Sequence, residues 1–377
     1  MGAMRWLEML AIGIWVFRET NSPELVAVMV MLRMLPMALL GSVTGVFADL
    51  VNRKWIMVVS LALMAVVAGV LGALVQAESV TLWHIGLGAF ISGACWSTDL
   101  PVRRTIMGEK VGRSELGTAM SLDSASNNAT RMAGPVIGGA LFAAVGLEGA
   151  YYVAAGVYVL AALFALSVAY EQKTEARRDF RFLADLRQGF AYLRKERPLI
   201  GHLSITVLIN LFAFPYISMA PVVGRDTFAL DPVGVGFLVS AEGAGAFAGS
   251  VLIAFLARPD RYRQIYLSGS LLFILGILVF SLTSNLYLGV VALIAGGFGI
   301  AGFAAMQSAI MFGAAPVEIR SRLMGILVVC IGAGPLGVVH VGWLAGLVGG
   351  SEALTIIAVE GLVSLILVVY LFPEIRR

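Results

Sequence analysis

Residues 120–139 read MSLDSASNNATRMAGPVIGG, a stretch that has the length of a helix but carries charged and amide side chains. Asp123, Asn127 and Arg131 are spaced four residues apart, so a helix would place them on one face. Long runs of Ala, Leu, Val and Gly lie on both sides. If these apolar runs cross a membrane, the charged helix face must line a cavity or contact a charged partner. The class of protein therefore has to be established first.

Those surroundings indicate a membrane protein. The chain has 377 residues, of which 59% are hydrophobic and 13% charged, and its mean hydropathy is +0.92. Soluble domains average about 25% charged residues. Short polar breaks separate twelve apolar segments, and about 20 apolar residues suffice to cross a bilayer. We therefore predict an all-α polytopic protein with twelve transmembrane helices, at approximately 2–17, 24–48, 55–76, 82–100, 117–145, 150–170, 199–222, 233–257, 265–283, 287–312, 323–347 and 352–372.

The basic residues predict the orientation. With a cytoplasmic N-terminus, 21 of the 26 Lys and Arg residues fall in cytoplasmic loops or the C-terminal tail. Only Arg18 and Arg225 fall in outer loops, and Arg5, Arg33 and Arg131 fall within spans. Since cytoplasmic loops of membrane proteins are enriched in Lys and Arg, both termini are expected inside.

The longest polar segment divides the chain into six plus six spans. We predict an N-terminal bundle at 1–170, a cytoplasmic linker at 171–198 and a C-terminal bundle at 199–377. The linker is expected to hold an amphipathic helix on the anionic inner leaflet, and a solvated basic linker is the alternative. Its apolar stripe consists of Phe182, Leu186, Phe190 and Leu193.

The two halves show a weak internal repeat. Gly41, Ser42, Val43 and Arg53 recur 208 residues later as Gly249, Ser250, Val251 and Arg261. Gly134, Gly139, Gly146 and Ala150 recur 203 residues later as Gly337, Gly342, Gly349 and Ala353. Two parallel six-helix halves with a substrate site between them are a common plan among transporters.

Residues 45–54, GVFADLVNRK, resemble the loop signature of the major facilitator superfamily, G-x-x-x-D-R-x-G-R-[RK]. The chain departs from the signature at Leu50 and Asn52. The resemblance implies a latch that holds the cytoplasmic side shut, and an ordinary charged turn is the alternative. The matching residues are Gly45, Asp49, Arg53 and Lys54.

A second motif resembles the fifth-helix motif of antiporters in this superfamily, and it implies export. Thr130 and Ser121 stand where the fuller pattern has glycine, and plain helix packing is the alternative. The motif residues are Gly134, Pro135, Gly138 and Gly139. Along nearly its whole length the chain resembles the enterobactin exporter and macrolide-efflux branch, the transmembrane secretion effectors. Against these relatives the first helix appears short and is expected to be truncated, and the arginine common in the middle of the fourth helix is missing.

Several charged residues fall at one depth. Glu8, Arg33 and Glu242 each lie nine or ten residues from the outer end of a span, about 14–15 Å deep at 1.5 Å per residue. Glu8 and Arg33 are on consecutive helices and are expected to pair; lipid headgroup contact is the alternative. We predict that the proton-coupling candidates are Glu8, Glu242 and Asp123. The substrate-cavity candidates are Arg33, Asn127, Arg131, Asn210 and Gln307.

Two alternatives accompany these site predictions. Arg131 is expected to bind an anion or relay protons, and a structural ion pair between helices is the other interpretation. Trp96, Phe212 and Tyr216 would suit aromatic drugs if they face inward.

These patterns favour a proton-coupled exporter of a small amphipathic molecule in the bacterial cytoplasmic membrane, acting as a monomer with lipid, protons and substrate as partners. An importer with the same fold and a non-transporting remnant are the alternatives. An enzyme is disfavoured, since no Gly-x-Ser-x-Gly, His-Glu-x-x-His or phosphate-binding Gly-rich loop occurs. No cofactor, metal or nucleic acid is expected. The cysteines and histidines show no ligand spacing: Cys95, Cys330, His84, His202 and His340.

Overall fold

The computed structural model describes residues 2–50, 52–110, 116–170, 191–194, 196–256, 259–314 and 320–376. Within these ranges the regular structure is helical throughout, which confirms the all-α prediction. The helices are α1 (Gly2–Thr20), α2 (Pro23–Leu50), α3 (Arg53–Gln76), α4 (Leu82–Lys110), α5 (Leu116–Ser167), α7 (Arg197–Phe212), α8 (Tyr216–Asp226), α9 (Pro232–Leu256), α10 (Tyr262–Leu282), α11 (Leu286–Ala314), α12 (Arg320–Ile331), α13 (Gly334–Val348) and α14 (Gly350–Leu371). Short 3₁₀ turns occur at Pro259–Arg261 and Pro373–Arg376.

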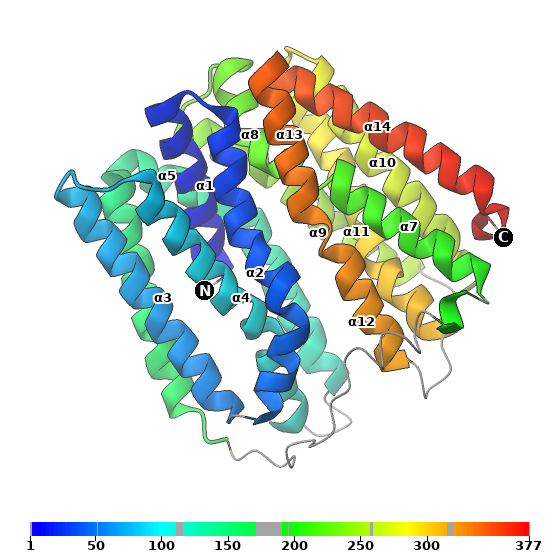
Figure 1. The fold of residues 1–377 in the computed structure, drawn as a ribbon, viewed down its shortest axis with the longest axis horizontal. Helices are drawn as coiled ribbons and strands as arrows, with labels where there is room; N and C mark the ends of the chain where they lie inside the picture. Colours follow the sequence, from blue (N-terminus) through cyan, green and yellow to red (C-terminus); the bar gives the residue numbers. More distant parts are fainter. Residues whose placement is uncertain are drawn as a thin grey trace.

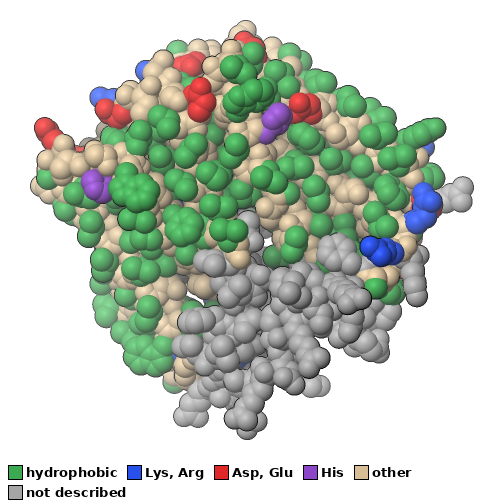
Figure 2. Space-filling model, viewed as in Figure 1, with side chains coloured by type: hydrophobic (Ala, Val, Ile, Leu, Met, Phe, Trp, Pro, Cys, Tyr) green, Lys and Arg blue, Asp and Glu red, His purple; other side chains and the backbone are tan. Residues whose placement is uncertain are grey.

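The helices coincide with the predicted spans. Eight stretches of the described residues are long and apolar enough to cross a membrane, from Arg53–Gln76 to Gly350–Leu371. The other predicted spans are helical as well, in α1, α2, α4 and the first part of α5. Charged side chains such as Arg5 and Glu8 make α1 less apolar than these eight stretches. Outside the grey atoms, Figure 2 shows hydrophobic side chains over much of the face and few charged ones, as expected of a surface in contact with lipid.

Two predicted spans are not single helices, and this corrects the prediction. The span at 199–222 is interrupted between α7 and α8, where Pro215 has no N–H to donate. The span at 323–347 is interrupted between α12 and α13, in front of Gly334 and Pro335. Interrupted helices are tolerated at membrane depth where neighbouring helices pack around the break.

Figure 1 shows α1–α5 on one side of the molecule and α7–α14 on the other. We call these sets the first-half and second-half helices. The predicted amphipathic linker helix lies mostly outside the described residues, since residues 171–190 are not among them. The domain division at residues 171–198 therefore stays a prediction.

The internal repeat is visible in backbone geometry. Gly146 (φ 68°) lies at the kink inside α5, and Gly349 (φ 98°) lies at the turn from α13 to α14. They are the only glycines with positive φ among the described residues, and they are repeat partners 203 residues apart. A side chain would be strained in both conformations. The same backbone turn therefore occurs at equivalent places in both halves.

Neighbour contacts repeat too. A Cβ added at Gly134 would lie 2.7 Å from the Cβ of Trp6 on α1. Its repeat partner Gly337 faces α7 in the same way, 2.7 Å from the Cγ of Pro215 just beyond that helix. Such close approaches need a residue without a side chain. The first helix of each half thus packs against the equivalent later helix of that half.

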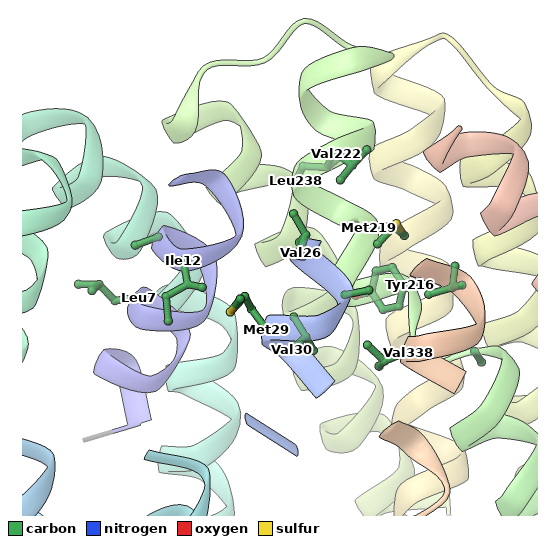
Figure 3. Packing of buried hydrophobic residues seen from close by; sticks show 14 of the residues in the cluster. Leu7, Ile12, Val26, Met29, Val30, Tyr216, Met219, Val222, Leu238 and Val338 are labelled. Atoms are coloured by element: carbon green, nitrogen blue, oxygen red, sulfur yellow. The ribbon is translucent and has the colours of Figure 1, made fainter. Parts of the chain in front are cut away.

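The core continues across the two sets of helices. In Figure 3 side chains of α1 and α2 lie close to side chains of α8, α9 and α13. All belong to one buried apolar cluster. Its labelled members are Leu7, Ile12, Val26, Met29, Val30, Tyr216, Met219, Val222, Leu238 and Val338. The two halves are therefore in direct apolar contact at these helix ends.

Candidate functional site

The first ion pair lies between α1 and α2. Arg33 Nη2 donates to Glu8 Oε2 at 3.1 Å, and both residues are buried, with 4% and 3% of their surface exposed. The predicted pairing of these two residues is confirmed. Their burial contradicts the alternative that they face lipid headgroups. A buried pair of this kind is stable only while both charges are present.

The second ion pair links the two halves. On α5 Arg131 donates from Nη2 to Glu242 Oε1 at 2.7 Å and from Nε to Glu242 Oε2 at 3.3 Å, and Glu242 lies on α9. Glu242 is 1% exposed, whereas the Arg131 side chain is 22% exposed. The Trp6 ring of α1 lies 5.9 Å from the guanidinium carbon. Arg131 thus takes part in an ion pair between helices, as its alternative interpretation stated.

Small residues bring α5 and α9 together at this pair. A Cβ at Gly243 would lie 2.7 Å from the carbonyl oxygen of Arg131, and one at Gly139 would meet the carbonyl oxygen of Pro232. Gly138, of the same motif, faces the Leu7 backbone of α1, where an added Cβ would lie 2.8 Å from its Cα. The motif Gly134, Pro135, Gly138 and Gly139 therefore packs α5 between α1 and α9. These contacts agree with the packing alternative, and the role of the motif in export stays a prediction.

Arg33 and Glu242 occupy corresponding places in the repeat. A Cβ added at Gly93 on α4 would meet the carbonyl oxygen of Arg33. A Cβ added at Gly297 on α11, 204 residues later, would meet the carbonyl oxygen of Glu242. The equivalent helices α2 and α9 thus carry opposite charges at corresponding positions, Arg33 and Glu242. Each of the two residues forms an ion pair with a residue on another helix.

A third polar group lies within the second half. Gln307 Nε2 donates to Thr206 Oγ1 at 3.1 Å, and Asn210 Nδ2 donates to the Thr206 carbonyl at 2.9 Å. His202 lies within 3.0 Å of the Gln307 carbonyl, and the Tyr266 hydroxyl lies 2.9 Å from Thr206 Oγ1. The structure brings the predicted residues Asn210 and Gln307 together, but with each other and not with Arg33 or Arg131. The sequence interpretation missed Thr206 and Tyr266, because polar residues in separate apolar spans carry no spacing signal.

Several predicted residues are placed differently or lie outside the described part. Asn127 is exposed on α5. The side chains of Asp123 and Asp49 lie outside the described residues, although the backbone of both, like that of Gly45, is helical. Phe212 lines an outer groove beside His340, so it does not face inward and that expectation is corrected.

Of the loop signature at residues 45–54, the structure describes the side chains at the C-terminal end, from Asn52 to Lys54. Arg53 is buried and donates from Nη1 to the Tyr170 hydroxyl at 3.3 Å. The Lys54 backbone N–H donates to the Asn52 side chain, which caps α3. Asn52, where the signature has glycine, therefore serves as a helix cap. The latch itself stays a prediction.

A network that the sequence interpretation missed lies beside the first ion pair. Asp99 on α4 forms ion pairs, with its Oδ2 3.7 Å from Arg103 and 4.0 Å from Arg5 on α1. The Arg5 guanidinium also lies 5.1 Å from the Trp96 ring centre. Arg5, which lies within the first span, therefore has partners. The sequence analysis estimated the depth of Glu8 but not of Arg5, so it did not predict this network.

An all-helical bundle with an internal repeat, whose halves are joined by a buried ion pair at mid-depth, is the architecture of a major facilitator superfamily transporter. The chain belongs to the transmembrane secretion effector family within that superfamily, because the family's model matches residues 3–376. The match covers all the helices described above.

Individual relatives agree with this class. The chain is 26% identical over 273 residues to YfiS, an uncharacterized MFS-type transporter of Bacillus subtilis (strain 168), covering 71% of this chain and 64% of YfiS. It is 25% identical over 300 residues to the multidrug efflux pump Tap of Mycolicibacterium fortuitum, covering 78% of this chain and 71% of Tap. A mutant of the nucleoside transporter NupG superposes with a TM-score of 0.77 at 15% identity, over 100% of this chain and 98% of NupG. The last likeness concerns the fold alone.

Proposed function

We propose that this protein exports a small amphipathic molecule from the bacterial cytoplasm in exchange for protons, by alternating access of its two halves. The observation that carries the proposal is the Arg131–Glu242 pair, which joins α5 of one half to α9 of the other. An ionisable pair at mid-depth is costly to bury, so its presence is evidence for a role in transport or in tight packing. The chain acts in the cytoplasmic membrane as a monomer, with both termini inside.

The described contacts support a state closed toward the outside. The charge distribution predicts that the α1–α2 turn and the start of α9 are outer. Near these ends Gly13 of α1 faces Pro221 of α8, and Gly342 of α13 faces Ala27 of α2. In this state Glu242 is bound to Arg131. Its protonation removes the negative charge, so the attraction that holds α5 against α9 is lost.

Substrate and proton compete in this scheme. Arg131 retains partial exposure, whereas Glu242 has almost none. Substrate binding at this pair from the cytoplasm and protonation of Glu242 from outside exclude each other, so substrate and proton occupy the pair in turn. Glu8 is the second proton candidate, because it forms a buried ion pair with Arg33 within the first half. Asp123 completes the set by its predicted position on the Arg131 face.

The direction and the substrate class rest on resemblance. The name of the relative Tap describes it as a multidrug efflux pump, which favours export. The resemblance to the enterobactin exporter and macrolide-efflux branch favours drug-like or siderophore-like molecules. The fifth-helix motif, here packed between α1 and α9, favours exchange over import.

The test uses inside-out vesicles whose lumen is acidified by respiration and followed with a pH-sensitive dye. A panel of siderophores, macrolides and lipophilic cations is added in turn. We expect at least one class to release luminal protons, and Glu242→Gln and Arg131→Gln to abolish this release. Glu148→Gln is the matched control, because Glu148 is exposed at the kink after Gly146.

Two results would contradict the proposal. Proton release that survives in Glu242→Gln and in Glu8→Gln would exclude both carboxylates. Substrate uptake into cells that follows the proton gradient inward, with no release from vesicles, would establish the importer instead.

A further inference from the structure

A groove lies on the outside of the second half, away from the ion pairs described above. It runs between α7, α13 and α14 and has a volume of about 660 Å³. Its walls are mainly apolar, and Gly337 of α13 is among the residues that line it. The lining includes Phe212, Leu336, His340, Glu360, Val363 and Ser364.

An acid–base pair lies in this groove. His340 Nε2 and Glu360 Oε2 are 2.8 Å apart, and the two side chains are 35% and 38% exposed. The Phe212 ring meets the His340 ring edge-on, with centroids 6.4 Å apart. Unlike the two central ion pairs, this pair is open to its surroundings.

The pair lies near the middle of the membrane. Glu360 is ten residues into α14, and His340 is nine residues before the turn at Gly349, so both lie about 14–15 Å from the outer end of their helices. Half of a bilayer core about 30 Å thick is the same distance. The neighbouring side chains Leu336 and Val363 are 68% and 59% exposed, as expected of a surface that faces lipid. An acid at this depth on a lipid-facing surface is expensive and indicates a functional site.

The fold itself does not require the pair. The repeat places Ile137 and Val157, 203 residues earlier, at the positions of His340 and Glu360. The first half therefore builds the same helix packing with two apolar side chains. The pair occurs in the second half alone. Since the first half packs without such a pair, helix packing does not explain why His340 and Glu360 are there.

We propose that this groove is a membrane-facing binding site for a protonated amine that carries an apolar tail or ring. The ammonium group pairs with Glu360, which has a second carboxylate oxygen in addition to the one that His340 contacts. Ser364 lies one helical turn further along the same face and offers a hydroxyl acceptor. Phe212, Leu336 and Val363 contact the apolar part. An anion is repelled by Glu360, so the site selects cationic amphiphiles that reach it through the lipid.

Binding to this groove does not require transport, so its test is independent of the function proposed above. The purified chain in lipid nanodiscs is exposed to dodecylamine carrying a photoreactive diazirine on its alkyl chain. The matched probe is dodecanol with the same diazirine. Labelled peptides are located by mass spectrometry.

We expect the amine to label the α13 and α14 residues that line the groove, and excess unlabelled dodecylamine to suppress this labelling. Excess dodecanol should not suppress it. Glu360→Gln should reduce the suppressible labelling about tenfold, because a charge-assisted hydrogen bond is lost. Glu352→Gln, on the exposed first turn of the same helix, should leave it unchanged.

Three results would overturn the proposal. Equal labelling by amine and alcohol, or unchanged labelling in Glu360→Gln, would show that lipid tails alone fill the groove. Protection of the groove together with a doubled protein mass per nanodisc would show that a second copy of the chain covers it. The comparison of amine and alcohol on the unsubstituted chain decides the matter even if Glu360→Gln fails to fold.

Discussion

At the scale of single residues, each buried charge of the Glu8–Arg33 pair depends on its partner. Arg33 contacts Glu8 through Nη2, while its Nη1 is buried and has no hydrogen-bond partner among the described residues. The hydroxyl group of Tyr216 and the Oγ of Ser240 are buried in the same condition. Buried polar groups without partners are rare, so each of these atoms lacks a hydrogen bond that such groups usually form.

The Glu8–Arg33 pair makes a direct stability prediction. Arg33→Gln leaves the Glu8 carboxylate buried without its counter-charge and should cost about 3–5 kcal/mol of folding free energy. The double variant Glu8→Gln, Arg33→Gln removes both charges and should recover most of that loss. The thermal unfolding midpoint in detergent micelles measures the difference. Glu19→Gln, exposed on the same helix, is the control, and additive losses in the double variant would contradict the pairing.

At the scale of elements, the turns that end α5's first part and α13 depend on one glycine each. Gly146 and Gly349 both have positive φ, a conformation that costs a residue with a side chain about 1–3 kcal/mol. We expect Gly146→Ala and Gly349→Ala to lower stability by similar amounts, measured as unfolding midpoints. Gly156→Ala should be neutral or stabilising, because Gly156 is helical and has open space around its Cα. Unequal losses at the two turns would argue against their equivalence.

We expect the contact between α5 and α9 to control how firmly the proposed outer side is closed. A side chain at Gly139 would collide with the Pro232 carbonyl, so Gly139→Val should separate these helices. Overpacking of about 1–3 kcal/mol would shift the balance of closed and open states about 5–150-fold. The reporter is Leu10→Cys, buried between α1 and α9 with Val235 and Val239, in a chain without Cys95 and Cys330.

Labelling of this cysteine by an impermeant maleimide, added outside intact cells, measures outward opening. We expect Gly139→Val to increase the labelling rate and Gly156→Val, on the same helix but free of contacts, to leave it unchanged. No increase with Gly139→Val would show that the α5–α9 contact does not govern closure.

At the scale of the whole molecule, the sequence predicted the features that depend on segments adjacent along the chain. Apolar runs predicted the helices, and the Glu8–Arg33 pair was predicted because consecutive antiparallel helices are neighbours. The Arg131–Glu242 pair joins residues 111 positions apart in different halves, and no sequence spacing indicates such a contact. His340 and Glu360 lie 9 and 11 residues from the turn at Gly349, so the depth argument applied to Glu8 would have found them.

The orientation of the whole molecule gives the last prediction, because the proposed direction of transport depends on it. The 21 basic residues predicted to be cytoplasmic would oppose translocation of their loops, which predicts the α10–α11 turn outside and the Pro259–Arg261 turn inside. In a chain without Cys95 and Cys330, Ser284→Cys should react with an impermeant maleimide in intact cells. Asp260→Cys should react only after permeabilisation, although its side chain is 73% exposed. The reverse pattern would turn the contacts of α1, α2 and α5 with α8, α9 and α13 toward the cytoplasm. The structure would then be closed inside, and Glu242 would have to receive its proton by the opposite route.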